Sequence, residues 1–577
     1  MLTHLVVRRF KQFQDVSIEL GSPVVFIGPN DSGKTTALQA LALWEIGLRR
    51  WNEKRAGRTT PEKRPGVTIN RRDLLTVPVP DAVFLWHDLG VRNVTRDPEG
   101  KQTTHNIRID VVVSGVTDGA AWECGFEFDY ANAESFYSRP LRLSQVGNGE
   151  RMPVPTAAAE TRIAFLPPMS GLAAQETRLD PGAISVRLGE GRTAEVLRNL
   201  CYRIYAAETD SRWDALTKRM TDLFGVELNP PNYVPERGEV TMTYRAQSGV
   251  QLDLAASGRG MQQTLLLLAH LADNPGSVLL LDEPDAHLEI LRQRQIYRVL
   301  TEVAAESGGQ IIAASHSEVI LNEAADRDVV VAFVGNPHRI DDRGSQVLKA
   351  LKEIGFEDYY QAEVAGWVIY LEGATDLSIL LAFAETLGHP AVEDLARPFV
   401  RYVLNQPTKA RDHFVGLREA KPDLAGFALF DRLDAKLQAN PYLVERMWKR
   451  REIENYLCQP ETLLAWAEST ARDPGAGPLF EQAEIDRRVK AMQESITDLV
   501  PPVALRDRAD RWWLDTKASD DFLDRLFVAY YTSLELPDLM RKSGYHQLAR
   551  HVPRGLLDHE ITDVLDEVHR IAQRQGA

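Results

Sequence analysis

The chain has 577 residues, of which 44% are hydrophobic and 26% are charged, and its formal net charge is −15. These values are ordinary for a globular protein, and the length predicts several domains. No apolar run approaches the roughly 20 residues that span a bilayer, so a membrane-spanning protein is excluded. Three widely spaced cysteines argue against a disulfide scaffold. We therefore expect a cytoplasmic protein without a signal peptide or a membrane partner.

The first informative stretch is a glycine-rich loop near the start of the chain. Alternating apolar and polar residues at 2–20 predict a short hairpin, and an apolar run at 23–27 leads into Gly-Pro-Asn-Asp-Ser-Gly-Lys-Thr at 28–35. A helical pattern follows from Ala37 to Leu48. This is the context of a phosphate-binding loop, in which backbone N–H groups at a helix N-terminus cradle phosphates. We expect ATP to bind here, with Lys34 on the β- and γ-phosphates and Thr35 on Mg²⁺. The expected binding residues are Gly28, Asn30, Ser32, Gly33, Lys34, Thr35 and Thr36.

A basic stretch follows the loop, with nine Lys or Arg between Arg49 and Arg72. Its prolines and glycines predict an exposed loop. Two interpretations stay open: a solvated loop, or a contact with a phosphate backbone, because a local basic patch can coexist with an acidic whole.

The region from 67 to 137 is rich in β-formers and predicts a lateral β-subdomain, with strands at 82–86, 107–113 and 122–128. A strand at 163–166 and helices over 193–224 are expected next.

A second cluster of motifs lies between residues 254 and 316. Ser257 and Gly258 precede an amphipathic helix at 264–272, which predicts a second anion site. The apolar run at 277–281 ends in Asp282 and Glu283, as expected of a buried parallel strand with acids at its carboxyl end. Asp282 would hold Mg²⁺ through water and Glu283 would orient or deprotonate the attacking water. A further strand at 310–314 leads to His316, which can contact the γ-phosphate. Taken singly, each motif could equally be a turn or a cap.

The order of these motifs resembles the ABC-type ATPases, and more narrowly their SMC-like and recombination-repair branch. The resemblance implies that Ser257 and Gly258 contact the γ-phosphate held by an opposite protomer. Two heads would then sandwich two ATP molecules in a homodimer or a higher homo-oligomer. Arg259 stands where the family signature has a glycine, and the chain has no long heptad stretch.

A new α/β pattern is expected after a linker near 336–344, which divides the chain into domains at 1–345 and 362–577. Predicted strands at 367–371 and 426–430 end in Glu372 and Asp431, and a third lies at 399–404. Carboxylates at neighbouring strand ends can converge on Mg²⁺ or Mn²⁺, although acids there also cap helices. Asp376 and Glu454 belong to the same group of acids. Spaced apolar residues from 533 onward predict closing helices.

A strand ending in Glu372-Gly-x-x-Asp376, followed by a strand ending in Asp431, resembles the TOPRIM domain. An ABC-type ATPase ahead of TOPRIM resembles the OLD (overcoming lysogenization defect) family, which includes the Gabija nuclease subunit. The resemblance implies that Glu372, Asp376, Asp431 and Glu454 bind the metal that cleaves nucleic acid. TOPRIM usually shows Asp-x-Asp, so Asp434 is one residue late and would need a shifted turn. Lys517 matches the family's catalytic lysine, or is a solvated surface lysine.

The sequence therefore predicts an α/β protein: an N-terminal ABC-type (SMC-like) P-loop ATPase with a lateral β-subdomain, then a C-terminal TOPRIM domain with a helical extension. The leading interpretation is an ATP-regulated, metal-dependent endonuclease of bacterial anti-phage defence that acts on DNA, with a partner defence protein left open. Two alternatives remain. One is an ATPase sensor or scaffold with an inactive TOPRIM domain. The other is an RNA- or tRNA-cleaving effector, because phosphate contacts do not distinguish DNA from RNA.

Overall fold

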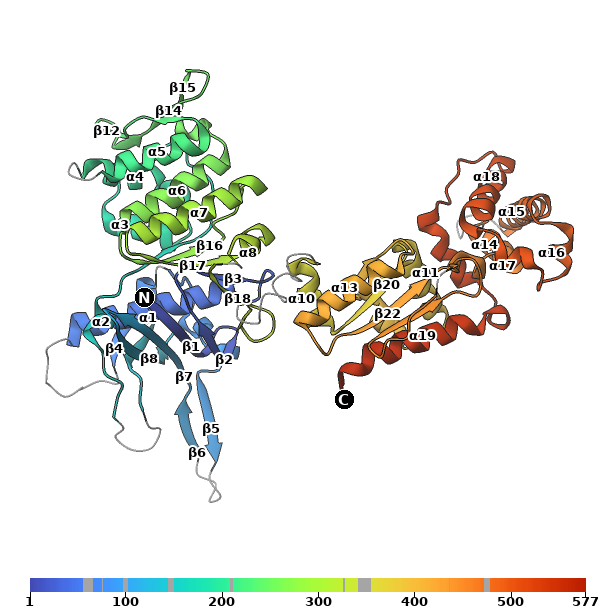
Figure 1. Cartoon of the computed structure of the whole chain (residues 1–577), viewed down its shortest axis with the longest axis horizontal. Helices are drawn as coiled ribbons and strands as arrows, with labels where there is room; N and C mark the ends of the chain where they lie inside the picture. Colours follow the sequence, from blue (N-terminus) through green and yellow to red (C-terminus); the bar gives the residue numbers. More distant parts are fainter. Residues whose placement is uncertain are drawn as a thin grey trace. The chain divides into compact units, whose positions relative to one another are not determined.

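The structure is a computed structural model that describes residues 1–55, 66–74, 76–96, 102–143, 150–207, 211–324, 327–340, 354–434, 436–471 and 478–576. The chain divides into two compact units, Met1–Leu348 and Lys349–Ala577, which are described in turn (Figure 1). None of the helices in these ranges combines the length and the apolar character needed to cross a membrane.

A six-stranded sheet forms the centre of the N-terminal unit, in the order β10-β16-β17-β3-β18-β19. Its first five strands are parallel, and β19 (His338–Arg339) is antiparallel. The strand that leads into the phosphate loop, β3, lies between β17 and β18. Both neighbours come much later in the sequence, since the earlier of them starts at Gln310. Because helices and a second sheet cover both faces, the central strands are buried along their whole length and are mostly apolar. The parallel strands are β3 (Val24–Ile27), β10 (Ile163–Leu166), β16 (Val278–Asp282), β17 (Gln310–Ser315) and β18 (Val329–Ala332).

The helix α1 (Lys34–Arg55) packs between this sheet and a second, antiparallel sheet in the order β2-β1-β7-β8-β9-β4. Apolar residues occur all around its first four turns, as a helix buried on two sides requires. At Gly47 a Cβ atom would come within 2.9 Å of Ser138 Oγ, so this position needs the absence of a side chain. The antiparallel strands are β1 (Leu2–Phe10), β2 (Phe13–Glu19), β4 (Val67–Asn70), β7 (Arg108–Thr117), β8 (Ala120–Asn132) and β9 (Ser135–Pro140).

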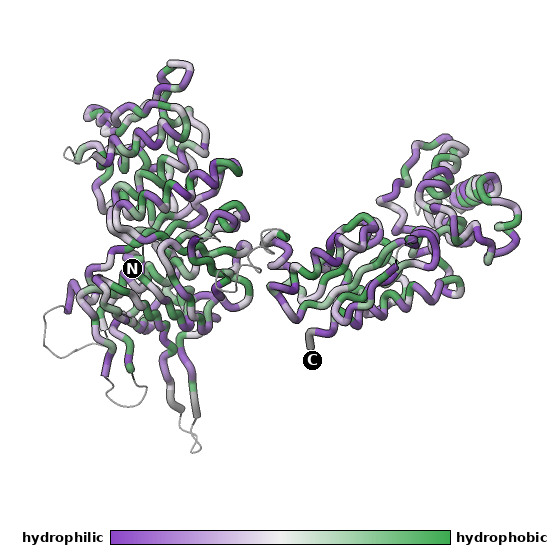
Figure 2. Tube along the Cα trace, in the orientation of Figure 1, coloured by the Kyte–Doolittle hydropathy of each residue, from purple (hydrophilic) through white to green (hydrophobic). Residues whose placement is uncertain are grey.

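A helical lobe covers the other face of the parallel sheet. Leu279 and Leu281 of β16 pack into the same core as the leucines of α6. Figure 2 shows hydrophobic and hydrophilic residues alternating along the helices of this lobe. A hairpin of β5 (Arg92–Arg96) and β6 (Gln102–Asn106) extends away from the antiparallel sheet (Figure 1). The helices are α2 (Thr156–Ala159), α3 (Pro181–Gly189), α4 (Leu197–Ala206), α5 (Arg212–Phe224), α6 (Arg259–Asp273), α7 (Ile290–Glu306) and α8 (Glu318–Ala324). Short strands are β11 (Glu227–Leu228), β12 (Asn232–Val234), β13 (Glu239–Thr241), β14 (Thr243–Arg245) and β15 (Gln251–Asp253).

Two expectations for this unit are wrong. The predicted strand at 82–86 is a 3₁₀ helix, Ala82–Leu85, because the Asp81 carboxylate accepts from Val83 N at 2.8 Å and caps a helical turn. The predicted basic loop is partly helical, since α1 continues to Arg55 and orders the first basic residues of the stretch. Arg49 and Arg50 then pair with Glu45, Glu53 and Asp73. Three other members of the stretch, Arg58, Lys63 and Arg64, lie outside the described residues.

The C-terminal unit is built on a four-stranded parallel sheet in the order β21-β20-β22-β23. Helices pack on both of its faces, and a separate apolar cluster lies on each. The strands are β20 (Trp367–Leu371), β21 (Val400–Tyr402), β22 (Ala425–Phe430) and β23 (Leu443–Met447). The helices are α10 (Phe356–Ala365), α11 (Ala374–Leu387), α12 (Ala391–Ala396), α13 (Pro407–Ala420) and α19 (His559–Ala572).

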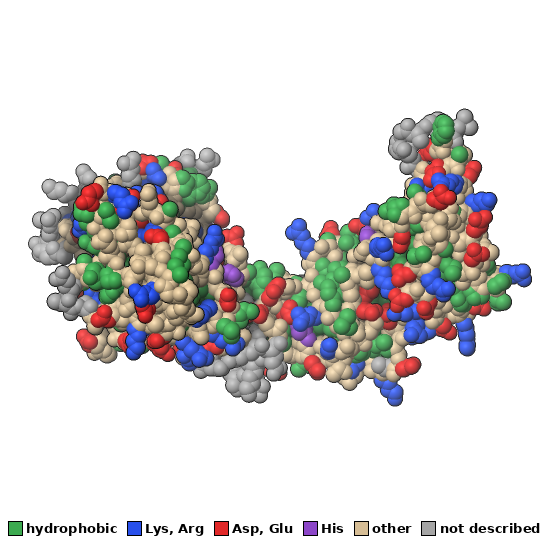
Figure 3. All heavy atoms as spheres, turned by 90° about the horizontal axis from the view of Figure 1, so that it is seen from above, with side chains coloured by type: hydrophobic (Ala, Val, Ile, Leu, Met, Phe, Trp, Pro, Cys, Tyr) green, Lys and Arg blue, Asp and Glu red, His purple; other side chains and the backbone are tan. Residues whose placement is uncertain are grey.

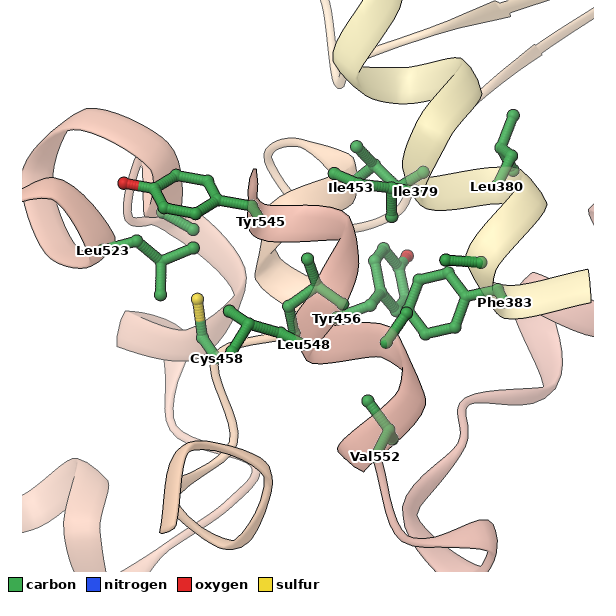
Figure 4. Packing of buried hydrophobic residues seen from close by; sticks show 14 of the residues in the cluster. Ile379, Leu380, Phe383, Ile453, Tyr456, Cys458, Leu523, Tyr545, Leu548 and Val552 are labelled. Carbon is green, nitrogen blue, oxygen red and sulfur yellow. The ribbon is translucent and has the colours of Figure 1, made fainter. Parts of the chain in front are cut away.

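A helical extension shares one core with this sheet. Ile379 and Phe383 of α11 pack near Leu548, in a 3₁₀ segment at Lys542–His551, and near Val552, which follows that segment (Figure 4). The elements of the extension are α14 (Pro460–Ala471), α15 (Pro478–Leu499), α16 (Pro502–Arg506), α17 (Arg511–Asp515), a π-helix (Ala518–Leu523) and α18 (Asp524–Ser533). The closing helices expected from residue 533 onward are the 3₁₀ segment Lys542–His551 and α19.

Candidate functional site

The phosphate loop lies between the carboxyl end of β3 and the first turn of α1. Gly33 takes a φ of +105°, which an L side chain rarely adopts, and a Cβ on Gly28 would come within 2.8 Å of the Phe333 carbonyl oxygen. Lys34 Nζ donates to the carbonyl oxygens of Gly28 (2.7 Å) and Pro29 (2.5 Å). Among the described residues, the buried hydroxyl of Ser32 has no hydrogen-bond partner, as expected of a group that meets a phosphate oxygen.

A cavity of about 190 Å³ lies over this loop. It brings together most of the residues that the sequence assigns to ATP, and it adds Gln12 from the turn between β1 and β2, which sequence reasoning missed. Its lining is Gln12, Asn30, Asp31, Ser32, Gly33, Lys34, Thr35, Thr36, Asp282 and Glu283.

Thr35 and Asp282 meet at the place expected for Mg²⁺. Thr35 Oγ1 donates to the two carboxylate oxygens of Asp282 at 3.0 and 3.2 Å. Burial raises the pKa of Asp282 to about 6, although the Thr35 hydrogen bond and the Lys34 charge oppose that shift. Burial also lowers the pKa of Lys34. An anionic nucleotide with its cation would satisfy both groups, so these residues fit Mg²⁺–ATP.

The expected catalytic pair lies at the ends of β16 and β17. Glu283 has a φ of +49°, and its N–H donates to the Ala314 carbonyl oxygen at 2.9 Å, which fixes the turn that carries its carboxylate. His316 Nδ1 lies 3.7 Å from Glu283 Oε1, and the imidazole is half exposed. Ser315 Oγ donates to Asp285 Oδ1 at 2.7 Å and braces the same turn. The structure thus places Glu283 and His316 side by side.

Ser257 and Gly258 stand apart from the phosphate cavity. Ser257 Oγ donates to the Leu254 carbonyl oxygen at 2.7 Å, and Gln262 Nε2 donates to the Ser257 carbonyl oxygen at 2.9 Å. Gly258 is the N-cap of α6, which starts at Arg259, five residues earlier than predicted. The described lining of the phosphate cavity includes neither residue.

The second site is a group of acids at the carboxyl edge of the C-terminal sheet. Glu372 follows β20 and Asp431 follows β22, and their side chains hydrogen bond to each other. Asn405 holds Asp431 in place, since its Nδ2 donates to Asp431 Oδ2 at 3.0 Å and its Oδ1 accepts from Asp431 N at 3.0 Å. Burial raises the pKa of Asp431 to about 9, and the charges of Glu372 and Asp376 add to the shift.

The remaining acids come from α11 and from a 3₁₀ helix, Ile453–Tyr456. Asp376 accepts a hydrogen bond from Gly373 N at 3.1 Å, and burial raises the pKa of this carboxyl to about 6. Burial raises the pKa of Glu454 to about 8, with further contributions from Glu452, Asp376 and Glu372. Sequence reasoning missed Glu452, whose carboxylate accepts from Ser519 N. The sequence feature that could have identified Glu452 is the acid-x-acid pattern Glu452-Ile453-Glu454.

Oxygen donors of this kind suit Mg²⁺ or Mn²⁺, and a cation would relieve the repulsion that raises the pKa values of these carboxyls. In the described ranges, however, no three His, Cys, Asp or Glu side chains are arranged to hold a metal ion. Binding would therefore require side-chain rotation.

Of the two remaining predicted residues, Lys517 lies near the acid group and Asp434 does not. Lys517 pairs with Asp520, which also pairs with Lys542, and this hydrogen bond is the main reason that the pKa of Lys517 is raised. Smaller contributions from Glu452 and Glu372 place the amine within electrostatic reach of the acids. Asp434 is exposed, and among the described residues it takes part in no ion pair or hydrogen bond. The structure does not bring Asp434 to the other acids.

Sequence profiles of two families match the N-terminal unit. Residues 4–79 match a family described as "AAA domain", and residues 208–322 match one described as "AAA domain, putative AbiEii toxin, Type IV TA system". A search of curated proteins gave no match. The profile matches and the geometry of the phosphate cavity together support a P-loop ATPase domain that uses nucleotide with Mg²⁺.

Among solved structures, the chain is similar to SMC head domains. The SMC head domain from Thermotoga maritima aligns at 13% identity with a TM-score of 0.33, covering 59% of this chain and 98% of that one. An SMC head bound to the C-terminal winged-helix domain of ScpA aligns at 15% identity with a TM-score of 0.35, with the same coverage. A Pyrococcus furiosus SMC head with an extended coiled coil, bound to the C-terminal domain of ScpA, aligns at 15% identity with a TM-score of 0.33, covering 61% and 99%.

Proposed function

We propose that the protein is an ATP-controlled, divalent-metal-dependent endonuclease of the OLD type, whose C-terminal unit is a TOPRIM domain acting on DNA. The observation that carries the proposal is the acid group at the carboxyl edge of β20 and β22. Acids that only capped helices would face solvent, whereas Glu372, Asp376, Asp431 and Glu454 are drawn together and partly desolvated. Such an arrangement is costly unless it serves a bound cation.

In the ATPase domain, Lys34 would neutralise the phosphates and Thr35 with Asp282 would hold Mg²⁺. Glu283 would orient or deprotonate the attacking water, with His316 beside it at the γ-phosphate. Ser257 and Gly258 lie outside the phosphate cavity of their own chain, which supports their use on the ATP of a second protomer. Two heads would thus close on two nucleotides in a homodimer or a larger assembly.

In the C-terminal unit, Glu372, Asp376, Asp431 and Glu454 would hold Mg²⁺ or Mn²⁺, with Asn405 fixing the orientation of Asp431. When bound, the metal supplies a nucleophile at neutral pH and stabilises the attacking and leaving oxygens. Lys517 adds positive charge where a scissile phosphate would lie. On the face seen in Figure 3, basic and acidic side chains are interspersed over this unit, so a nucleic acid there would meet scattered cations.

A role in anti-phage defence, with or without a partner protein, fits the toxin that one matched family's description names.

The test is cleavage of labelled DNA and RNA by the full chain with Mg²⁺ or Mn²⁺, with and without ATP. Glu372→Gln and Asp431→Asn should abolish cutting. Asp423→Asn is the matched control, because Asp423 is an exposed acid in the turn that precedes β22. This variant should cut like the wild type. If Glu372→Gln cuts as fast as the wild type, the proposed metal site is wrong. The nucleic acid that the wild type degrades decides between a DNA and an RNA substrate.

A second function, an ATPase sensor or scaffold with an inactive C-terminal domain, is favoured by one observation. In the described ranges no group of three acids is arranged to hold a metal. ATP hydrolysis that is lost in Glu283→Gln, without cutting of any substrate, would support this reading.

A further inference from the structure

The segment that leads to Ser257 is a single 3₁₀ turn, Leu254–Ala256, between β15 and α6. Asp253 is the N-cap of this turn, because its Oδ1 accepts a hydrogen bond from Ala255 N at 2.8 Å. Ser257 closes the turn, since its N–H and its hydroxyl both donate to the Leu254 carbonyl oxygen. The position of Ser257 therefore depends on the cap at Asp253.

A buried arginine holds the same aspartate. Arg198 of α4 is 1% exposed, and its Nη2 donates to Asp253 Oδ1 at 3.0 Å. The Asp253 side chain is half exposed, so the ion pair joins the interior of the helical lobe to its surface. A buried ion pair adds little net stability, and its best-attested role is to select one arrangement of the chain. Here the arrangement that it selects is that of the turn before Ser257.

Arg198 is itself fixed from two further directions. Its Nη1 donates to the Ala173 carbonyl oxygen at 2.8 Å, in the segment that follows β10. The buried carboxylate of Glu176, in the same segment, accepts hydrogen bonds from Arg198 N at 2.9 Å and Asn199 N at 2.7 Å. β10 pairs with β16, whose carboxyl end lines the phosphate cavity. Arg198 therefore ties the turn before Ser257 to the sheet that carries the phosphate loop of its own chain.

We propose that Arg198 and Asp253 are positioning residues for Ser257, which hold its turn where the serine reaches the γ-phosphate bound to a second protomer. The inference rests on the proposed use of Ser257 across two heads, and it names the residues on which that use depends. The described lining of the phosphate cavity includes neither Arg198 nor Asp253. Loss of the ion pair should therefore slow ATP hydrolysis while the phosphate loop still binds ATP.

The test measures ATP hydrolysis at saturating ATP, and binding of a non-hydrolysable ATP analogue, with the full chain. Asp253→Ala removes both the ion pair and the cap, and its half-exposed position tolerates replacement better than the buried Arg198 does. The rate of hydrolysis should fall by about tenfold to a hundredfold, the loss that follows when a mutation misplaces an active-site group by about 1 Å. The analogue should still bind, because the phosphate loop is unchanged.

Asp81→Ala is the matched control, because Asp81 also caps a 3₁₀ turn, Ala82–Leu85, by accepting from Val83 N at 2.8 Å. This variant should hydrolyse ATP like the wild type. The double variant Asp253→Ala, Ser257→Ala gives a result that a merely structural defect would not. If Asp253 acts through Ser257, the double variant should hydrolyse ATP at the rate of Ser257→Ala alone.

The proposal is overturned if Ser257→Ala is impaired but Asp253→Ala hydrolyses ATP like the wild type. It is also overturned if the double variant loses a further tenfold relative to Ser257→Ala, because Asp253 would then act independently of the serine. Wild-type hydrolysis by Ser257→Ala would overturn the proposed use of Ser257 together with this inference. The behaviour of Ser257→Ala therefore separates failure of the positioning residues from failure of the proposed function.

Discussion

The phosphate loop and the acid group occupy equivalent positions in their two units, each at the carboxyl ends of parallel strands. They differ in the charge they carry and in the partners of their charged groups. The phosphate loop has a buried cation, Lys34, that rests on backbone carbonyls until an anion replaces them. The acid group has half-buried carboxyls, such as Glu372 and Asp431, which hydrogen bond to each other, while Asn405 holds Asp431. In the first site the cation is hydrogen bonded even without a ligand, whereas in the second site the carboxyls repel one another.

This difference has a general cause. Backbone N–H groups and a helix N-terminus form an anion site that costs the fold little. Clustered carboxylates repel one another and lose hydration, so their geometry depends on a cation that the chain does not supply. Substitutions at the two sites should therefore act on function and stability in different ways.

The largest expected effect is in the phosphate loop. Lys34→Ala should lower the rate of ATP hydrolysis by about 10²–10³-fold, the loss typical of removing a charge that stabilises a transition state. The melting temperature should stay the same or rise, because burial already disfavours the charged amine. Lys54→Ala, an exposed lysine on the same helix, is the control and should hydrolyse ATP normally. An active Lys34→Ala variant would contradict the assignment of this loop.

The acid group should respond in the opposite sense. Without metal, Asp431→Asn should raise the melting temperature, since it removes one of the repelling carboxyls. Mn²⁺ should stabilise the wild type, by about 2.7 kcal/mol at a hundred times its Kd, and should leave Asp431→Asn unchanged. Calorimetric scans with and without Mn²⁺, in the absence of nucleotide, measure both effects. Equal stabilisation of the two proteins would place the metal elsewhere.

The units can also be compared through pH. Burial lowers the pKa of His270 to about 4, so the native state resists a proton that the unfolded state takes up near its ordinary value of 6.5. Stability should therefore fall as the pH drops from about 6.5 to 4, by up to about 1.4 kcal/mol per pH unit. Urea unfolding at pH 7, 6 and 5 should show a shallower fall for His270→Leu. Parallel slopes for the two proteins would contradict this account.

The smallest effect is expected at Asp434. Because this carboxylate is exposed and makes no described contact, Asp434→Ala should change the rate of metal-dependent cleavage by less than about twofold. A loss of cleavage as large as that of Glu372→Gln would show that Asp434 does belong to the metal site.

Local motifs explain which parts of these sites could be predicted. The phosphate loop and the strand ending in Asp282 and Glu283 are contiguous, so periodicity and turn chemistry define them. Gln12 reaches the same cavity from a distant hairpin turn, and no local pattern marks it.

The acid group contains more residues that the sequence does not predict. The strands that end in Glu372 and Asp431 were predictable, but their partners come from separate segments. Asn405 lies in a turn with a φ of +54°, and Glu452 reaches the site through a 3₁₀ helix. Asp434 stands one residue late for the expected pattern, and its side chain is exposed. Where a side chain points after a turn depends on packing that one sequence does not reveal.

The position of β3 has a consequence for synthesis. Both strands that flank it, β17 and β18, follow it by almost the whole length of the N-terminal unit. At about 5–20 residues per second, a ribosome needs roughly 15–60 s to supply them. During that time an entirely apolar strand, Val24–Ile27, has no neighbour on either edge. The nascent chain should therefore depend on chaperones over this interval, and slower translation between residues 28 and 310 should lengthen its exposure to aggregation.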